Sequence, residues 1–170
     1  GGTFNVGHRH PAVLQALETA LQTLDVGNHH FPSPARAELA EKLALHTPGD
    51  LHYTVYAAGG SEAVDVAIKS ARRFTKRRRI VAIASGYHGR TGLSGAAGDD
   101  STARYFASDY PDEFLTVPFD DLDAMRVALQ GQDVAAVILE TVPATAGFPV
   151  PSDGYLPGVA ALCREYGALY

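Results

Sequence analysis

The stretch that decides the fold runs from residue 59 to residue 84 and reads GGSEAVDVAIKSARRFTKRRRIVAIA. After the two glycines, apolar residues recur at three- and four-residue steps, which is typical of a helix with one buried face. These residues are Val64, Ala67, Ile68, Ala71 and Phe74. The run from Ile80 to Ala84 is short and wholly apolar, as expected of a strand in a parallel sheet that is covered on both faces. A helix that leads into a buried strand predicts an α/β fold.

The same alternation continues toward the C-terminus. Phe114–Val117 is a weaker strand candidate, and Val134–Leu139 is another compact apolar run. Helical spacing of apolar residues predicts a helix around Leu122, Met125 and Leu129, behind Asp120 and Asp121, and another around Leu156, Val159, Cys163 and Tyr166. Gly167 is expected to end the last helix, and Ala168–Tyr170 to begin a further buried strand. Together these elements predict a three-layer α/β fold, in which helices flank a mainly parallel sheet.

Two more helices and one strand are expected before residue 59. Pro11 and Pro34 suit the first turn of a helix, and Ser33 can cap the second. The expected buried stripes are Val13, Leu14, Leu17, Leu21 and Leu24 in the first helix and Leu39, Ala40, Leu43 and Ala44 in the second. Leu51, Tyr53, Val55 and Ala57 alternate with polar or small residues, which favours a strand.

Composition excludes several classes of function. The 170 residues are 46% hydrophobic and carry a formal net charge of −5, so a packed core is expected and nucleic acid is not the expected partner. No run approaches the length of a membrane-spanning helix. The single cysteine, Cys163, excludes an internal disulfide and is expected in the core, which makes a cytoplasmic location the default. Both ends look unfinished, and we expect a segment of a longer protein.

Ligands of open α/β sheets bind beyond the carboxyl ends of the strands, and three loops follow such ends here. The first holds Gly60 and Ser61, where unpaired helical N–H groups, the helix dipole and a hydroxyl suit an anion. A plain helix start, with Ser61 as its cap, explains the same residues and is the commoner case.

The other two loops carry an aromatic ring, an imidazole and a carboxylate. Tyr87 can stack on a flat heterocycle with His88 as a nearby donor, or it can be a half-buried loop residue. Glu140 ends an apolar strand, where it is either a functional group or simply emerges into solvent.

Other polar clusters favour ordinary structural roles. The adjacent His29 and His30 lack further ligands nearby, so no metal site is predicted. Lys76–Arg79 follows the central helix and is interpreted as a solvated helix end, where cations offset the helix dipole.

Four motifs in order resemble the class III aminotransferases, which are pyridoxal-phosphate enzymes of the aspartate-aminotransferase fold. They are Asn5-Val6-Gly7-His8-Arg9-His10-Pro11, Gly59-Gly60-Ser61-Glu62-Ala63-Val64, Tyr87-His88-Gly89-Arg90-Thr91 and Val137-Ile138-Leu139-Glu140. The resemblance covers nearly the whole chain. It implies an N-terminal segment over residues 1–32 and the N-terminal half of the large cofactor-binding domain over residues 33–170.

The resemblance also implies site roles. Gly60 and Ser61 would hold the phosphate of pyridoxal 5'-phosphate, Tyr87 would stack on its ring beside His88, and Glu140 would lie near cofactor and substrate. Glu62 would be structural. The implied reaction moves an amino group between an amino acid or amine and a 2-oxo acid or aldehyde, in a homodimer.

The resemblance places the Schiff-base lysine beyond this sequence. Lys42, Lys69 and Lys76 are the lysines present, and all lie in expected helical segments. We therefore expect the parent protein to be a transaminase and this chain alone to be inactive. The alternative is a non-catalytic or truncated module of the same fold that binds a phosphate ligand. The coding sequence after residue 170 would discriminate between the two.

Overall fold

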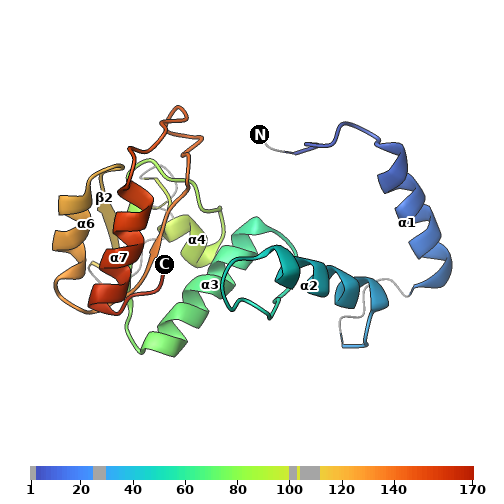
Figure 1. Cartoon of the computed structure of the whole chain (residues 1–170), viewed down its shortest axis with the longest axis horizontal. Helices are drawn as coiled ribbons and strands as arrows, with labels where there is room; N and C mark the ends of the chain where they lie inside the picture. The colour runs from blue at the N-terminus through green and yellow to red at the C-terminus, as the bar shows by residue number, and fades with distance from the viewer. Residues whose placement is uncertain (1–2, 25–29, 100–102, 104–111) are drawn as a thin grey trace. The chain divides into compact units, whose positions relative to one another are not determined.

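The computed structural model describes residues 3–24, 30–99, 103 and 112–170. The chain forms two compact units, Gly1–Val55 and Tyr56–Tyr170 (Figure 1). The expected division between residues 32 and 33 concerns the domains of a longer protein and stays a prediction.

The first unit contains the two expected helices, α1 (Pro11–Thr23) and α2 (Pro34–His46). Both open on a proline, and the Ser33 hydroxyl accepts a hydrogen bond from the N–H of Arg36, which confirms the predicted cap. The expected buried stripes are wrong, because neither helix has a buried residue among those described. Amphipathic spacing indicates which face of a helix favours burial. Within this unit, no described element buries the apolar face of α1 or of α2.

The expected strand around Leu51, Tyr53 and Val55 is also wrong. Residues 51–57 are coil with no strand pairing among the described residues, and these three side chains are exposed. Alternation favours an extended backbone, but a strand also needs a neighbour to bond with, which the alternation does not specify.

The second unit is an α/β sheet with helices between its strands. In chain order its elements are α3 (Gly60–Thr75), β1 (Arg79–Ile83), α4 (Gly92–Ala96), β2 (Phe114–Val117), α6 (Leu122–Leu129), β3 (Val134–Ile138) and α7 (Tyr155–Tyr166). The three strands are parallel in the order β2-β1-β3, which confirms the three predicted strands after residue 59. Leu169 forms a single parallel bridge with Ala136 of β3, so pairing continues where a further strand was expected.

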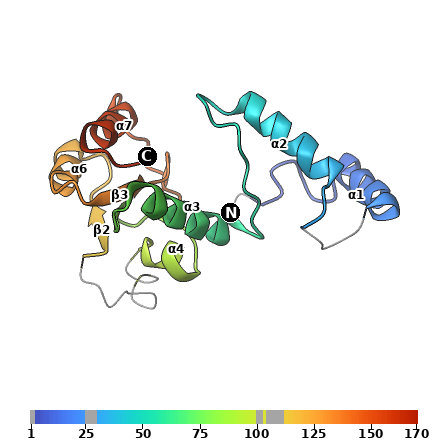
Figure 2. The same cartoon turned by 90° about the horizontal axis from the view of Figure 1, so that it is seen from below.

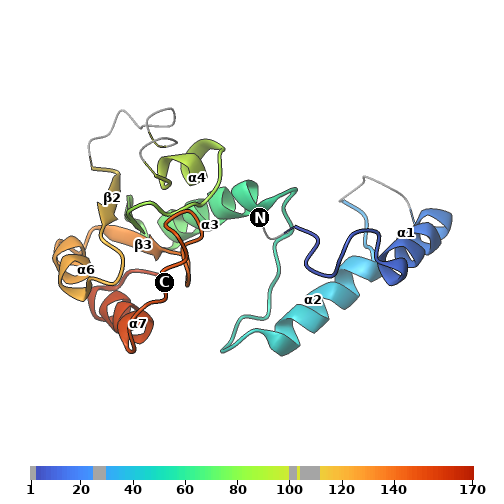
Figure 3. The same ribbon diagram turned by 90° about the horizontal axis from the view of Figure 1, so that it is seen from above.

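The sheet lies between two layers of helices, which confirms the predicted three-layer architecture (Figures 2 and 3). Successive side chains of a strand point to opposite faces. Val81 and Ile83 of β1 therefore pack in the core with α6 and α7, whereas Ile80 and Ala82 pack with α3. Cys163 of α7 is buried in the first of these cores, as predicted, and burial raises the pKa of its thiol to about 11.

The inner face of α3 differs in part from the predicted stripe. Ile68 and Ala71 are buried, but Ala67 and Phe74 are exposed. A helix turns about 100° per residue, so Phe74 lies about 120° around the axis from Ile68 and misses the sheet. Polar residues such as Arg72 are partly buried in its stead.

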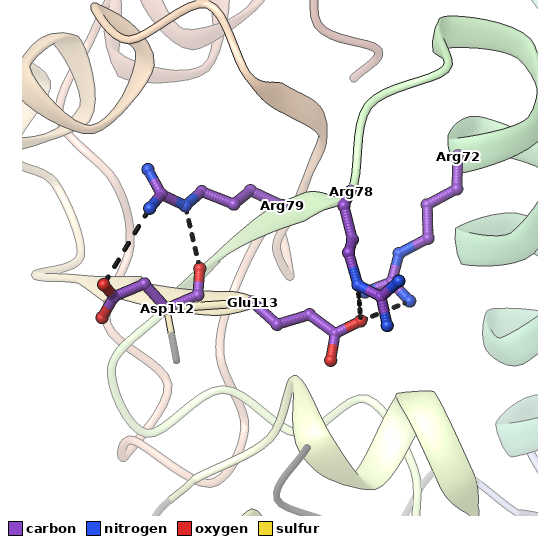
Figure 4. A network of polar contacts seen from close by, with 5 residues as sticks. All are labelled: Arg72, Arg78, Arg79, Asp112 and Glu113. Carbon is purple, nitrogen blue, oxygen red and sulfur yellow. Dashed lines mark hydrogen bonds and ion pairs between the residues drawn. The ribbon is translucent and has the colours of Figure 1, made fainter. Parts of the chain in front are cut away.

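Ion pairs join the amino ends of the three strands, and those at β1 and β2 are drawn in Figure 4. Arg79, the first residue of β1, contacts Asp112 before β2 and Asp133 before β3. The nearly buried carboxylate of Glu113 accepts from Arg72 at 2.9 Å and from Arg78 at 3.1 Å. The interpretation of Lys76–Arg79 as a solvated helix end holds for the exposed Lys76 and Arg78. It is wrong for Arg77 and Arg79, which are partly buried, because a short α3–β1 link brings them to the edge of the sheet.

Arg77 has a different role in the same link. Its Nη1 donates to the carbonyl oxygens of Val134, Tyr166 and Gly167, at 3.2, 2.7 and 2.8 Å. Gly167 ends α7 in the left-handed conformation with φ of 70°, as the helix-stop prediction requires. The guanidinium thus satisfies carbonyls that the end of α7 leaves unpaired.

Candidate functional site

The carboxyl edge of the sheet brings together the residues that the sequence singles out. The N-terminus of α3 carries Ser61, the loop after β1 carries Tyr87 and His88, and the loop after β3 carries Glu140. Hydrogen bonds join the loop after β1 to each of the other two segments.

Ser61 is not the cap of its helix. The N-cap residue is Gly59, which has an extended backbone and no side chain to cap the helix. Ser61 lies within the first turn of α3. The Ser61 Oγ instead accepts a hydrogen bond of 3.1 Å from the N–H of Arg90. A hydroxyl has one proton to donate, so the accepted bond leaves that proton for another acceptor. The interpretation of Ser61 as a plain helix cap is therefore wrong.

Gly89 lets the loop approach α3 this closely. Its φ is 138°, and a Cβ at this position would lie 2.6 Å from the Ser61 Oγ and 2.7 Å from the Ser94 Oγ. Any side chain would force the loop away from the helix. Sequence reasoning noted Gly89 only as part of a motif, since a contact between segments far apart in the chain leaves no local signal.

Asp65 is a second residue that sequence reasoning missed. Its carboxylate accepts from the N–H of Ser94 at 2.6 Å and from the Thr91 hydroxyl at 2.9 Å. Burial alone would raise the pKa of Asp65, but these hydrogen bonds outweigh burial and hold the pKa below its ordinary value. The available signal was its spacing, because residues four apart, such as Ser61 and Asp65, share one face of a helix.

Glu140 links the two strand-end loops. One carboxylate oxygen accepts from the N–H of Tyr87 at 2.9 Å, and the other accepts from the N–H of Ala144 at 3.4 Å. The carboxylate therefore has protein partners and does not simply emerge into solvent. The Tyr87 ring is 43% exposed, and the Arg90 guanidinium lies 5.9 Å from its centroid.

His88 is buried, at 7% exposure, whereas Ser61, Tyr87 and Glu140 are partly or largely exposed. Its Nε2 has no hydrogen-bond partner among the described residues. Burial lowers the pKa of His88, and the nearby Glu140 carboxylate opposes this shift only in part. The imidazole is therefore neutral at pH 7.

Glu62 directly follows Ser61 but bonds in another direction. Glu62 accepts from the N–H of Ala58 in the segment before α3. His29 lies outside the described residues, and within the described part of the chain no three His, Cys, Asp or Glu residues gather as metal ligands would. Among the described helices, none is long and apolar enough to cross a membrane.

The three lysines are spread over the chain. Lys42 pairs with Glu38 on α2, in the first unit, and Lys69 lies within α3. Lys76 caps the C-terminus of α3, at the far end from Ser61. With a rise of about 1.5 Å per residue, those two ends of the helix are roughly 20 Å apart.

Comparison with known proteins shows the family and the fold. The family model described as Aminotransferase class-III matches residues 2–170. An uncharacterized aminotransferase of Archaeoglobus fulgidus is 48% identical over 169 residues, which is 99% of this chain and 39% of that protein. The chain thus spans about two fifths of the length of this relative.

Two solved structures are similar in fold at 25% sequence identity, each with a TM-score of 0.84. The ornithine aminotransferase from Toxoplasma gondii ME49 matches 98% of this chain with 41% of its own. The taurine:2-oxoglutarate aminotransferase from Bifidobacterium kashiwanohense, in complex with PLP and glutamate, matches 97% of this chain with 43% of its own. On the strength of the family match over residues 2–170, this chain belongs to the class III aminotransferases.

Proposed function

We propose that the chain supplies the phosphate- and ring-binding half of the pyridoxal-phosphate site of an aminotransferase. The observation that carries the proposal is the bonding of the Ser61 hydroxyl. Its oxygen accepts a hydrogen bond from the Arg90 N–H, so its proton is available for a ligand beside the first turn of α3. Family membership supports the choice of cofactor, as does similarity to the Bifidobacterium aminotransferase, whose structure is a complex with PLP.

The residues present fit the cofactor. The first N–H groups of α3 and the helix dipole favour a phosphate dianion, and a Cβ at Gly60 would meet nothing within 4 Å, so the approach to these groups is open. The half-exposed Tyr87 ring offers a face for an aromatic ring. The unpartnered Nε2 of His88 is a further polar group at the same edge.

Each of these residues has a role that the described contacts support. Ser61 donates to a phosphate oxygen, and the N-terminus of α3 stabilises its charge. Glu140 fixes the backbone of Tyr87, so that the ring is held at the mouth of the site. When bound, the cofactor supplies an electron sink for the carbon that carries the amino group.

The proposal for the parent protein is broader. It is a cytoplasmic homodimer that transfers an amino group between an amino acid or amine and a 2-oxo acid or aldehyde. Family membership supports the reaction class and the dimer, and the single buried cysteine suits the cytoplasm. None of Lys42, Lys69 and Lys76 contacts the described site residues through a hydrogen bond, so we propose that the chain alone does not catalyse the reaction.

Ligand binding tests this proposal most simply. In the intact protein, Kd values for pyridoxal 5'-phosphate and pyridoxal are compared for the wild type, Ser61→Ala and the matched control Ser70→Ala, which changes an exposed serine of the same helix. We expect Ser61→Ala to weaken phosphate-ligand binding by about 1.5–3 kcal/mol, with pyridoxal and the control unaffected. Equal losses for both ligands, or no loss, would contradict the assignment of Ser61.

Substitution of Tyr87 tests the ring-binding half. Tyr87→Phe keeps the aromatic face, whereas Tyr87→Ala loses about 0.5–1.5 kcal/mol of stacking beyond area burial. Equal losses of affinity in the two variants would show that the hydroxyl matters and that stacking is the wrong role.

A further inference from the structure

A second set of hydrogen bonds holds the residues that follow the Gly89–Arg90 segment. Thr91 and Ser94 both donate to Asp65, which lies one helical turn after Ser61 on α3. The Ser94 hydroxyl, wholly buried, donates in turn to the carbonyl oxygen of Thr91. Asp65 therefore fixes this segment to the same face of α3 that carries Ser61.

The position of the segment determines how the Ser61 hydroxyl can be used. A serine within a helix tends to donate to a backbone carbonyl three or four residues earlier, which consumes its only proton. Here the Arg90 N–H lies 3.1 Å from the Ser61 Oγ and engages a lone pair of that oxygen. The backbone of Gly89 packs against the same hydroxyl, where a Cβ would be 2.6 Å away. These contacts favour one orientation, with the proton available to a ligand.

We infer that Asp65 is a positioning residue of the phosphate site, which acts through Thr91, Ser94 and Arg90 on the Ser61 hydroxyl. The inference rests on the proposed function, because it assumes that Ser61 binds the phosphate. It adds a residue that touches no ligand and whose effect on binding passes through Ser61.

A double-mutant cycle in the intact protein separates positioning from general support of the fold. The probes are 4-deoxypyridoxine 5'-phosphate and 4-deoxypyridoxine, which differ only in the phosphate, with binding measured by calorimetry. Asp65→Ala should weaken binding of the phosphorylated probe about five- to tenfold, as expected for a lost hydrogen bond, and leave the other probe unchanged. In a Ser61→Ala background, Asp65→Ala should have no further effect.

Three variants serve as controls. Asp121→Ala removes the carboxylate that caps α6, so it should lower stability without altering the affinity for either probe. Thr91→Val removes one donor to Asp65 and replaces Asp65→Ala in the cycle if that variant fails to fold. Thr91→Ser keeps the hydroxyl and should retain wild-type affinity.

The outcomes are distinguishable. Either of two results would overturn the inference: Asp65→Ala weakens phosphate binding equally in the wild-type and Ser61→Ala backgrounds, or it weakens binding of both probes. Asp65 then has only a structural role, and the proposed function still stands. If the wild type does not prefer the phosphorylated probe, or Ser61→Ala leaves that preference unchanged, the phosphate assignment itself fails, and the inference fails with it.

Discussion

The two edges of the same sheet use polar residues in opposite ways. At the amino edge, Arg72, Arg78 and Arg79 pair with Asp112 and Glu113, so charges are neutralised within the protein (Figure 4). At the carboxyl edge, the groups that could donate to a ligand are the neutral Ser61 hydroxyl and the first backbone N–H groups of α3. The comparison teaches that arginines gathered at one edge of a sheet can be neutralised by carboxylates of the same protein.

The hollow at the amino edge supports this distinction. Its volume is about 430 Å³, and it is lined by four cationic and three acidic side chains, together with Gln132. The cationic residues are Lys76, Arg77, Arg78 and Arg79, and the acidic ones are Asp112, Glu113 and Asp133. A phosphate dianion would gain little there, because the nearby carboxylates already neutralise most of the positive charge.

The largest expected effect on stability comes from removing the buried ion pair at the amino edge. Glu113→Ala removes a carboxylate that is 3% exposed and leaves Arg72 without its partner, 2.9 Å away. Loss of one member of a buried ion pair should lower the free energy of unfolding by about 3 kcal/mol, measured by urea denaturation.

The matched control is Asp112→Ala, at the same edge. Its carboxylate is 68% exposed and 3.9 Å from Arg79, so its loss should cost about 0.5 kcal/mol or less. Affinity for pyridoxal 5'-phosphate should be unchanged in any Glu113→Ala protein that remains folded. Comparable destabilisation by the two substitutions would refute the distinction between buried and exposed pairs.

A smaller change in stability, with a large change in binding, is expected at the carboxyl edge. Gly89→Ala places a methyl group 2.6 Å from the Ser61 Oγ and in a strained backbone conformation. We expect a loss of about 2 kcal/mol in stability and a marked loss of phosphate-ligand affinity.

Gly154→Ala is the control for backbone strain alone. Gly154 also has a positive φ, of 92°, but a Cβ there would meet nothing within 4 Å. The Gly154→Ala protein should therefore lose stability but keep its affinity for the phosphate ligand. If Gly89→Ala bound the phosphate ligand as tightly as Gly154→Ala, the close approach of the loop to Ser61 would be irrelevant to the site.

The smallest effect is a dependence of stability on pH that originates at His88. Burial lowers the pKa of His88 below the ordinary value of 6.5, so the unfolded state takes up this proton at higher pH than the folded state. Stability should therefore fall as pH drops from 6.5 toward the folded pKa. His88→Gln should show a shallower fall between pH 7.5 and 5.5 in urea denaturation. An identical slope in both proteins would mean that His88 titrates normally.

The sequence predicts the second unit better than the first, for a physical reason. Ile80–Ile83, the first four residues of the apolar run, are buried on both faces of the sheet, so the pattern alone indicates β1. The alternating residues Leu51, Tyr53 and Val55 would form a strand only if another strand paired with them, and the local sequence does not specify such a strand. Phe74 was assigned to the wrong face of α3 because three-residue steps drift around a helix of 3.6 residues per turn.

The candidate site follows the same rule. Tyr87, His88 and Glu140 could be named in advance because they follow β1 and β3, and strand ends are fixed by the fold class. Ser61 was named after an expected strand that the described residues do not form, so only the helix start with its glycines indicated it. The connections of the site could not be named in advance, because the hydrogen bonds from Thr91 to Asp65 and from Tyr87 to Glu140 join residues 26 and 53 positions apart. Such contacts depend on how the elements pack.

The central claim is that phosphate binds at the carboxyl edge of the sheet and not at the arginine-rich amino edge. A titration of the ¹⁵N-labelled intact protein with pyridoxal 5'-phosphate, followed by NMR, observes both edges at once. We predict large shifts of the backbone N–H resonances of Gly60 and Ser61, with the side-chain Nε–H resonances of Arg78 and Arg79 unmoved. Shifts of the arginine resonances, with Gly60 and Ser61 unchanged, would contradict the claim.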